Sequence, residues 1–203
     1  MRRGDAVGTA GPGRQGEAVS YEIILADPPW SYRDSANAGK RGAVHKYRTR
    51  GLPEICALDV RGIAAPNCLL ALWWVPPMPE EALKVVKAWG FTLKTMKGFT
   101  WHKTTKHGKS HFGMGHWTRA NTEDCLFAVR GKPKRANADV RQFIEAPRGR
   151  HSAKPAEVRE RLVRLMGDVP RIEMFAREAI PGWDVWGNEV ESTMNRAVEC
   201  EHW

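Results

Sequence analysis

Four consecutive residues, Asp27-Pro28-Pro29-Trp30, offer the most specific chemistry in the sequence. The Asp27 carboxylate and a backbone carbonyl, that of Pro28, are two hydrogen-bond acceptors, and the paired prolines fix φ and hold both acceptors still. Trp30, followed by Tyr32, provides a ring that can stack on a base. Two fixed acceptors and a ring suit an aromatic amine such as the exocyclic amino group of adenine, whose delocalised lone pair must be localised before it attacks a methyl group.

Such a site would act mainly by positioning. In-line alignment of an amine and a methyl donor can contribute about 7–11 kcal/mol, and the acceptors would stabilise the growing positive charge. Asp27 need not be a strong general base, because the amine proton becomes acidic once the methyl group arrives. The alternative interpretation of the tetrapeptide is a turn that merely ends a strand.

Short apolar runs that alternate with amphipathic segments must position this motif. Residues 22–26 form a β-branched apolar run, which predicts a buried parallel strand that ends at Asp27. Ligands bind at the carboxyl ends of such strands in open α/β sheets. Further strands are expected at 68–75, 91–95, 99–103, 125–130 and 172–176, and helices at 79–89 and 155–166. The alternation predicts an α/β fold with a doubly wound, mostly parallel sheet and helices on both faces.

Length and composition set wider bounds. The 203 residues fit a flexible leader (1–20), one folded domain (21–191) and a tail (192–203). The net charge of +9 suits a polyanionic partner. The four cysteines show no C-x-x-C spacing, which argues against a disulfide framework and for a reducing compartment. The longest apolar run, 68–77, is too short to span a membrane, and the leader has no apolar signal segment.

The chain resembles the adenine N-6 methyltransferases related to the catalytic subunit of the eukaryotic messenger-RNA adenosine methyltransferase, a family with small bacterial and phage members. The similarity covers roughly 21–191, so this segment is expected to be the methyltransferase domain. Beyond the tetrapeptide, its markers are Tyr47, Leu72-Trp73, Trp89-Gly90, 101–104, 115–117, Glu123, 151–155, 172–177 and 182–189. The order and spacing of these markers together are specific. They imply a Rossmann-like fold with permuted motif order. The resemblance also implies an enzyme that uses S-adenosylmethionine in the cytoplasm of a bacterial or phage-infected cell.

The resemblance also assigns roles to single residues. It implies catalytic roles for Asp27, Pro28, Pro29 and Trp30. It places Lys154 against the methionine carboxylate of S-adenosylmethionine, beside a helix N-terminus that favours an anion. The cofactor nucleoside would be lined by Glu173, Met174, Phe175 and Arg177, with Asn188 and Glu189 nearest the ribose hydroxyls. Core packing is the alternative for Met174 and Phe175.

Loops around the target base are expected to carry the substrate contacts. The resemblance assigns these contacts to Tyr47, His116, Trp117, Glu123 and Ser152. Because adenine's amino group is paired inside a duplex, the substrate must be single-stranded or the base must be flipped out.

Four histidines within fifteen residues, His102, His107, His111 and His116, raise the alternative of a zinc site. Their spacing fits no pair on a predicted helix, no cysteine accompanies them, and interleaved lysines would repel a cation. We therefore expect no bound metal and interpret the segment as a basic loop that contacts phosphate. Further basic residues between 119 and 150 extend this rim.

The motif leaves the methylated polymer open. We favour DNA over RNA because the small form resembles bacterial and phage members, and RNA remains the alternative. A protein amide as acceptor is disfavoured, because enzymes of that kind usually carry Asn-Pro-Pro-Tyr. A non-catalytic nucleic-acid-binding partner subunit is disfavoured by the intact tetrapeptide and by Lys154 and Asn188.

Overall fold

The computed structural model describes residues 20–31, 33–34, 41–42, 51–113, 117–149 and 153–194. Most of the expected leader and tail, and the predicted substrate residues Tyr47, His116 and Ser152, lie outside the described residues. No helix in the described ranges is long and apolar enough to cross a membrane.

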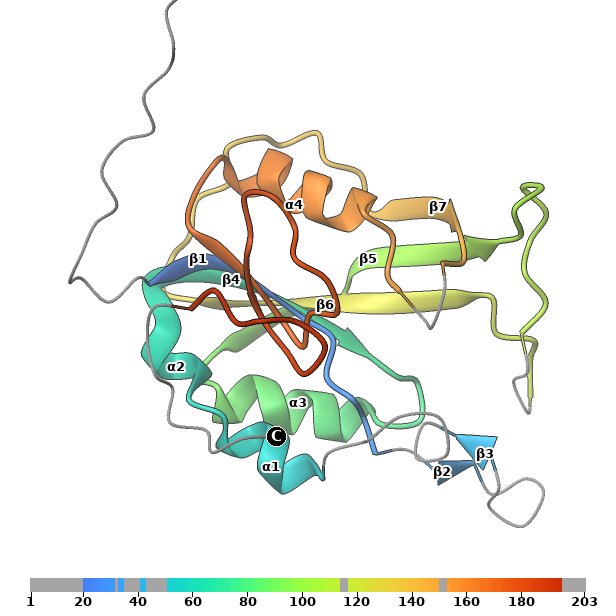
Figure 1. Cartoon of the computed structure of the whole chain (residues 1–203), viewed down its shortest axis with the longest axis horizontal. Helices are drawn as coiled ribbons and strands as arrows, with labels where there is room; N and C mark the ends of the chain where they lie inside the picture. Colours follow the sequence, from blue (N-terminus) through green and yellow to red (C-terminus); the bar gives the residue numbers. More distant parts are fainter. Residues whose placement is uncertain are drawn as a thin grey trace, which may run out of the picture.

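A seven-stranded sheet forms the centre of the molecule, in the order β7-β5-β6-β4-β1-β8-β9 (Figure 1). Its strands are β1 (Tyr21–Ala26), β4 (Ala64–Trp74), β5 (Thr92–Thr104), β6 (Thr122–Arg130), β7 (Phe143–Pro147), β8 (Arg171–Met174) and β9 (Asp184–Trp186). A separate two-stranded ribbon pairs β2 (Arg33–Asp34) with β3 (Arg41–Gly42). Only β6 runs against its neighbours β4 and β5, while the other four pairings in the sheet are parallel. The predicted mostly parallel α/β sheet is confirmed.

Helices cover both faces of this sheet. Figure 1 shows α1 (Leu52–Ala57), α2 (Val60–Ile63) and α3 (Pro79–Ala88) on one face and α4 (Glu157–Met166) on the other. Alternate side chains of β1 pack on opposite faces of the sheet: Ile24 lies in the core under α3, and Ile23 lies in the core under α4. This is the period-two burial expected of a strand covered on both faces.

The helix α3 forms where the sequence predicts it. Pro79 occupies the first turn together with the acidic Glu80 and Glu81, and Val85 and Val86 face the core. Gly90, at φ 81°, follows the end of the helix, in the left-handed region where glycine has no steric penalty.

One prediction about the strands is wrong. Segments 91–95 and 99–103 form the single strand β5, whose register against β6 shifts on both sides of Thr95. Gly98 lies in this irregular stretch, where a Cβ would overlap the ring of Phe127. The glycine and the bulge interrupt the alternation of apolar residues, so one strand has the sequence pattern of two.

The carboxyl ends of four parallel strands meet at one edge. Ala26 of β1 pairs with Leu72 of β4 and with Met174 of β8, and Met174 pairs with Trp186 of β9. Asp27 therefore follows β1 at the same level as the residues that follow β8 and β9. We call this the carboxyl edge, and it is where open α/β sheets bind their ligands.

Candidate active site

Asp27 directly precedes a tight turn at the carboxyl edge. The Trp30 amide N–H donates to the Pro28 carbonyl at 2.8 Å, which closes a three-residue turn over two prolines. A carbonyl oxygen has two lone pairs, so Pro28 keeps one for another donor. The turn thus holds the Asp27 carboxylate and the Pro28 carbonyl in a fixed relation.

Trp30 anchors this turn from inside the core. Its side chain is 5% exposed, and its indole N–H donates to the Trp73 carbonyl at 3.0 Å. The expected stacking of Trp30 on a base is therefore not what the structure shows. A large ring that buries apolar surface and satisfies its only donor is stable in the core, so Trp30 positions Asp27 instead.

Two carboxylates and two lysines form an ion cluster around Asp27. Lys154 Nζ lies 2.6 Å from Asp27 Oδ2 and 3.4 Å from Glu123 Oε2, and Glu123 also pairs with Lys103. The Lys154 ammonium lies 5.3 Å from the centre of the Trp73 ring, close enough for a cation–π contact. We call Asp27, Glu123, Lys154 and Lys103 the ion cluster. Its formal charges cancel, which makes its burial tolerable.

Mutual pairing favours the charged forms of two members of the cluster, Lys154 and Glu123. Burial opposes the charge of Lys154, but the carboxylates of Asp27 and Glu123 outweigh it and raise the pKa of Lys154 above its usual value. Burial likewise opposes ionisation of Glu123, and the ammonium groups of Lys154 and Lys103 outweigh it and lower the pKa of Glu123. Both shifts favour the charged forms of Lys154 and Glu123.

The structure gives Lys154 two protein partners in addition to the role that the resemblance assigned to it. Lys154 does precede the helix α4, as expected, but its ammonium group is bound by Asp27 and Glu123. The lysine thus pairs with two side chains of the protein, and its contact with the methionine carboxylate stays a prediction. Glu123, expected as a substrate contact, lies in the cluster next to Asp27.

Two residues at the end of β8 that were expected to contact the nucleoside have contacts within the protein. Glu173 receives two hydrogen bonds from the Arg159 guanidinium, at 2.6 and 3.3 Å, so both of its oxygens are engaged. Met174 is 4% exposed and belongs to the core under α3, which is the packing alternative. Glu173 ties α4 to β8, and this pair fixes the strand end that faces the carboxyl edge.

The other expected cofactor residues gather on the loops after β8 and β9. Phe175 adopts a left-handed φ of 62°, a rare conformation for a non-glycine residue, and its ring meets Trp186 edge-on at 5.5 Å. Arg177 Nε lies 3.9 Å from a carboxylate oxygen of Glu189, and Asn188 is exposed beside it. The structure brings these four expected residues together at the carboxyl edge.

A glycine permits the close approach of these two loops. A Cβ at Gly187 would overlap the backbone of Ala176, and the Ala176 amide donates to the Trp186 carbonyl at 3.0 Å. Only glycine allows the two chain segments to come this close.

The remaining predictions concern the loop between β5 and β6. Trp117 is fully exposed, as a stacking ring requires, and its contact with a base stays a prediction. His102 binds Glu145 and Ser110 through its two ring nitrogens, at 2.9 Å each, and His111 binds Arg148 at 3.1 Å. Within the described residues, no three His, Cys, Asp or Glu side chains are placed to hold a metal ion.

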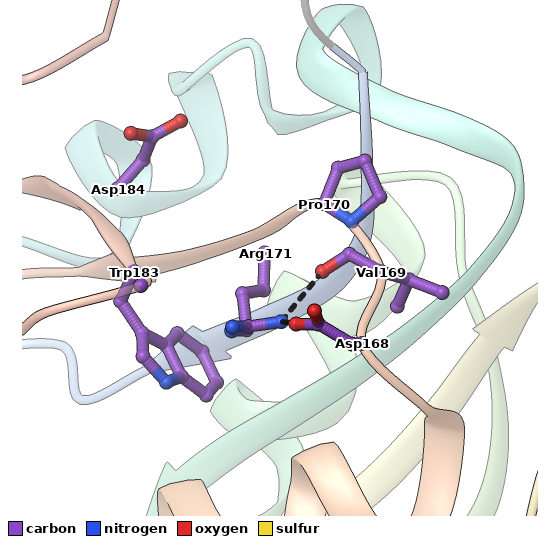
Figure 2. Close-up of a pocket in the computed structure, with 7 residues that line it drawn as sticks. Asp168, Val169, Pro170, Arg171, Trp183 and Asp184 are labelled. Atoms are coloured by element: carbon purple, nitrogen blue, oxygen red, sulfur yellow. Dashed lines mark hydrogen bonds and ion pairs between the residues drawn. The ribbon is translucent and has the colours of Figure 1, made fainter. Parts of the chain in front are cut away.

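An open pocket lies at the opposite edge of the sheet. It is formed around the first residues of β8 and β9, and Figure 2 shows Arg171 between Asp168 and the ring of Trp183. Arg171 Nη1 donates to Asp168 Oδ1 at 2.6 Å and to the Val169 carbonyl at 3.0 Å. These contacts join neighbouring loops at the amino ends of the strands, away from Asp27.

Sequence reasoning gave no individual role to Lys103, Trp73 or Arg159. Lys103 and Trp73 fall within family markers, which was the available signal. The partner of Lys103, however, depends on strand register. Trp101 of β5 pairs with Glu123 of β6, and Lys103, two residues after Trp101, lies on the same face of β5 and so reaches Glu123.

Comparisons with known proteins identify the family of this chain. The MT-A70 family model matches residues 21–189. The type II methyltransferase M.MunI of a Mycoplasma species is 35% identical over 188 residues, which cover 84% of this chain and 78% of that protein. The human N(6)-adenine-specific methyltransferase METTL4 is 27% identical over 190 residues, and the matched region is 84% of this chain but 38% of METTL4.

A fungal relative extends the comparison to RNA. The N6-methyladenosine RNA methyltransferase MTA1 of Cryphonectria parasitica is 28% identical over 185 residues, which are 86% of this chain and 53% of MTA1. The family match spans the sheet, the tetrapeptide, the ion cluster and the loops after β8 and β9, and the fold is the Rossmann-like fold of this family. The chain therefore belongs to the MT-A70 family of methyltransferases.

Proposed function

We propose that this protein transfers a methyl group from S-adenosylmethionine to the exocyclic N-6 amino group of adenine in nucleic acid, with DNA favoured over RNA. The observation that carries the proposal is the arrangement around Asp27. Lys154 holds Oδ2, and within the described residues no hydrogen bond engages Oδ1. Asp27 Oδ1 and the remaining lone pair of the Pro28 carbonyl are two acceptors for the two N–H bonds of one amino group.

The chain's own residues would orient the amine and balance its charge. Two accepted hydrogen bonds fix the plane of the amino group and direct its lone pair. As the nitrogen attacks, positive charge grows on it, and the carboxylates of Asp27 and Glu123 stabilise that charge without having to reorganise. The methylated nitrogen then loses a proton to solvent, with Asp27 as the hydrogen-bond acceptor next to it. Lys154 donates to Asp27 Oδ2 and so fixes the orientation of the carboxyl group.

The loops after β8 and β9 fit S-adenosylmethionine by their chemistry. Asn188 and Glu189 offer exposed oxygen acceptors for ribose hydroxyls, and Phe175 offers an apolar ring beside them. When bound, S-adenosylmethionine supplies a methyl group activated by its sulfonium centre. We propose that it is held by Phe175, Arg177, Asn188 and Glu189. Glu173 and Met174 support this site indirectly, because their contacts within the protein fix the end of β8.

DNA is favoured as the polymer on two grounds. The chain resembles small bacterial and phage members, and its identity to the type II methyltransferase, 35%, exceeds its identity to the RNA methyltransferase MTA1, 28%. A single-stranded or flipped adenine is required in either polymer.

The test supplies isotopically labelled S-adenosylmethionine with single- and double-stranded DNA and RNA, each with adenine present or absent. The proposal expects labelling that requires adenine, that is higher on DNA, and that is lost in Asp27→Ala. Lys97→Ala, an exposed lysine on β5 outside the ion cluster, is the matched control and should keep full activity. Labelling without adenine, or full activity of Asp27→Ala, would overturn the proposal.

A further inference from the structure

Lys103, near the end of β5, is the member of the ion cluster to which the proposed function gives no role. Its ammonium group pairs with Glu123 Oε1, and the other oxygen of this carboxylate, Oε2, lies 3.4 Å from Lys154 Nζ. Lys154 Nζ in turn lies 2.6 Å from Asp27 Oδ2. The side chains therefore form a row of alternating formal charge, in the order Lys103, Glu123, Lys154 and Asp27.

The position of Lys103 is fixed by its strand and by an aromatic ring. Its amide donates to the Asn121 carbonyl at 2.8 Å, and its carbonyl accepts from the His111 amide at 2.8 Å. Its ammonium group lies 5.5 Å from the centre of the Trp101 ring, within cation–π range. That ring is itself fixed, because Trp101 is 2% exposed and its indole N–H donates to the Ala146 carbonyl at 2.9 Å. The lysine side chain therefore has little freedom to leave its carboxylate partner.

The low exposure of Lys103 argues against a contact with phosphate. Lysines ordinarily keep the ammonium group in water, where a phosphate can reach it. The Lys103 side chain is 18% exposed, whereas that of Lys97, on the same strand, is 61% exposed. A lysine that is mostly covered, with a carboxylate and an indole ring as its neighbours, acts on that carboxylate instead.

The two oxygens of Glu123 have different partners, and this sets the rotation of its carboxylate. Lys103 holds Oε1, which leaves Oε2 turned toward Lys154. Without Lys103, Glu123 could turn either oxygen toward Lys154 and draw its ammonium group away from Asp27. Misplacement of a reacting group by about 1 Å can cost about 100-fold in rate. The contact between Lys103 and Glu123 therefore bears on the position of Asp27.

We propose that Lys103 is a positioning residue for methyl transfer, which acts on Asp27 through the other members of the ion cluster. Lys103 fixes the rotation of Glu123. Glu123 then limits the movement of Lys154, so that its ammonium group stays on Asp27. The proposal rests on the proposed function and adds a residue that acts through the protein, without contact to the adenine.

The charged groups that face Glu123 come from three parts of the fold. Lys103 lies on β5 and Lys154 lies before α4, while Asp27, after β1, lies beyond Lys154. Burial opposes the charge of Glu123, and Lys154 and then Lys103 outweigh it and lower its pKa. Loss of Lys103 removes one of these two cations, so it should raise the pKa of Glu123.

His111 is a second titratable group near Lys103. Burial, the guanidinium of Arg148 and the ammonium group of Lys103 all lower the pKa of His111. Loss of Lys103 should therefore raise this pKa too, and the experiment must separate the two groups.

The experiment uses the full chain and an adenine-containing oligonucleotide that the wild-type protein methylates. It compares wild type with Lys103→Met, Lys103→Arg and Lys97→Met, an exposed lysine of the same strand as the matched control. We expect kcat of Lys103→Met to fall about 10- to 100-fold, while KM for the oligonucleotide changes by less than about 2-fold. Lys103→Arg keeps the charge and should recover most of the loss, and Lys97→Met should equal wild type.

The pH profile distinguishes positioning from a general loss of structure. In Lys103→Met the acid limb of kcat should lie at higher pH than in wild type, because Glu123 takes up its proton more readily, and Lys103→Arg should restore it. His111→Gln should leave the acid limb in place, which assigns the limb to Glu123. If Lys103→Met does not fold by circular dichroism, Lys103→Gln replaces it with the same expected outcomes.

Three results would overturn the proposal. They are a kcat of the Lys103 variant equal to that of Lys97→Met, an acid limb that does not move, and an acid limb that moves equally in His111→Gln. A rise in KM together with a slope of log affinity against log salt concentration that flattens by about 1 would show a phosphate contact instead.

A wild-type protein that methylates no oligonucleotide would refute the proposed function, and the role of Lys103 then has a test without activity. Lys103 and Lys154 both act on Glu123, so their losses of unfolding free energy should not be additive in Lys103→Met/Lys154→Met. Additive losses in urea unfolding would overturn the positioning of Glu123 by Lys103.

Discussion

Replacement of Lys154 by methionine tests the ion cluster. The substitution keeps the length of the side chain and removes a cation that contacts both Asp27 and Glu123. Loss of one partner from a buried ion group costs about 3–5 kcal/mol. We expect about 3 kcal/mol of unfolding free energy, the lower end, because the side chains of Lys154, Asp27 and Glu123 are 14%, 26% and 28% exposed.

The measurement is urea unfolding of wild type and Lys154→Met, followed by tryptophan fluorescence at neutral pH. Lys97→Met is the matched control, because Lys97 lies 3.9 Å from Asp124 and is 61% exposed, and it should change stability by less than about 0.5 kcal/mol. Methyl transfer by Lys154→Met should fall about 100-fold, as when one preorganised charge is removed from an active site.

The loss of stability in Lys154→Met should depend on pH with a definite sign. The raised pKa of Lys154 means that its contribution is complete below its ordinary pKa of about 10.5 and is lost as the pH rises through the raised value. The lowered pKa of Glu123 means that its contribution is complete above about 4.5 and is lost as the pH falls through the lowered value. The difference in unfolding free energy between wild type and Lys154→Met should therefore be constant between about pH 5 and 10 and should decrease outside that window. A loss of unfolding free energy no larger than that of Lys97→Met, or one that increases in acid, would refute the stabilising role of the ion cluster.

Three further changes test the neighbouring structure. Trp30→Phe removes the hydrogen bond to the buried Trp73 carbonyl and should cost about 2 kcal/mol in urea unfolding; an unchanged midpoint would mean that Trp30 does not anchor the turn. Gly187→Ala forces a Cβ against the backbone of Ala176 and should weaken the calorimetric affinity for S-adenosylmethionine while costing about 1–3 kcal/mol of stability. Unaltered affinity in that variant would separate the loops after β8 and β9 from the cofactor. Glu123→Gln should be less stable than wild type at pH 7, and the difference should shrink below about pH 4.5, since Glu123 contributes only while ionised; a difference that stays constant down to pH 3 would contradict the pairing.

Much of the fold is predictable because local pattern decides it. The strand β1 is an apolar run that stops at two prolines, and α3 carries both of its end signals. The strands β7 and β9 were not predicted. β9 has three residues, and β7 alternates weakly with exposed Phe143 and Glu145, so neither has a periodicity long enough to recognise.

The site is predictable to a different degree. Asp27 follows from the tetrapeptide and its strand, both local in sequence. The contact of Lys154 with Asp27 spans 127 residues and exists because β1, β6 and the segment before α4 meet at one edge. No local pattern encodes that meeting. The burial of Trp30 was missed for the same reason, since its acceptor on Trp73 belongs to the neighbouring strand.

The central claim is that Asp27 and Pro28 hold the amino group of adenine for methylation. The most direct measurement is mass spectrometry of the nucleosides released from unmethylated DNA after incubation with S-adenosylmethionine and either wild type or Asp27→Asn. The account predicts N6-methyldeoxyadenosine with the wild-type protein and a loss of at least about 100-fold with Asp27→Asn, whose folding is checked by circular dichroism. Methylation of a different base or position, or an Asp27→Asn protein as active as wild type, would contradict it.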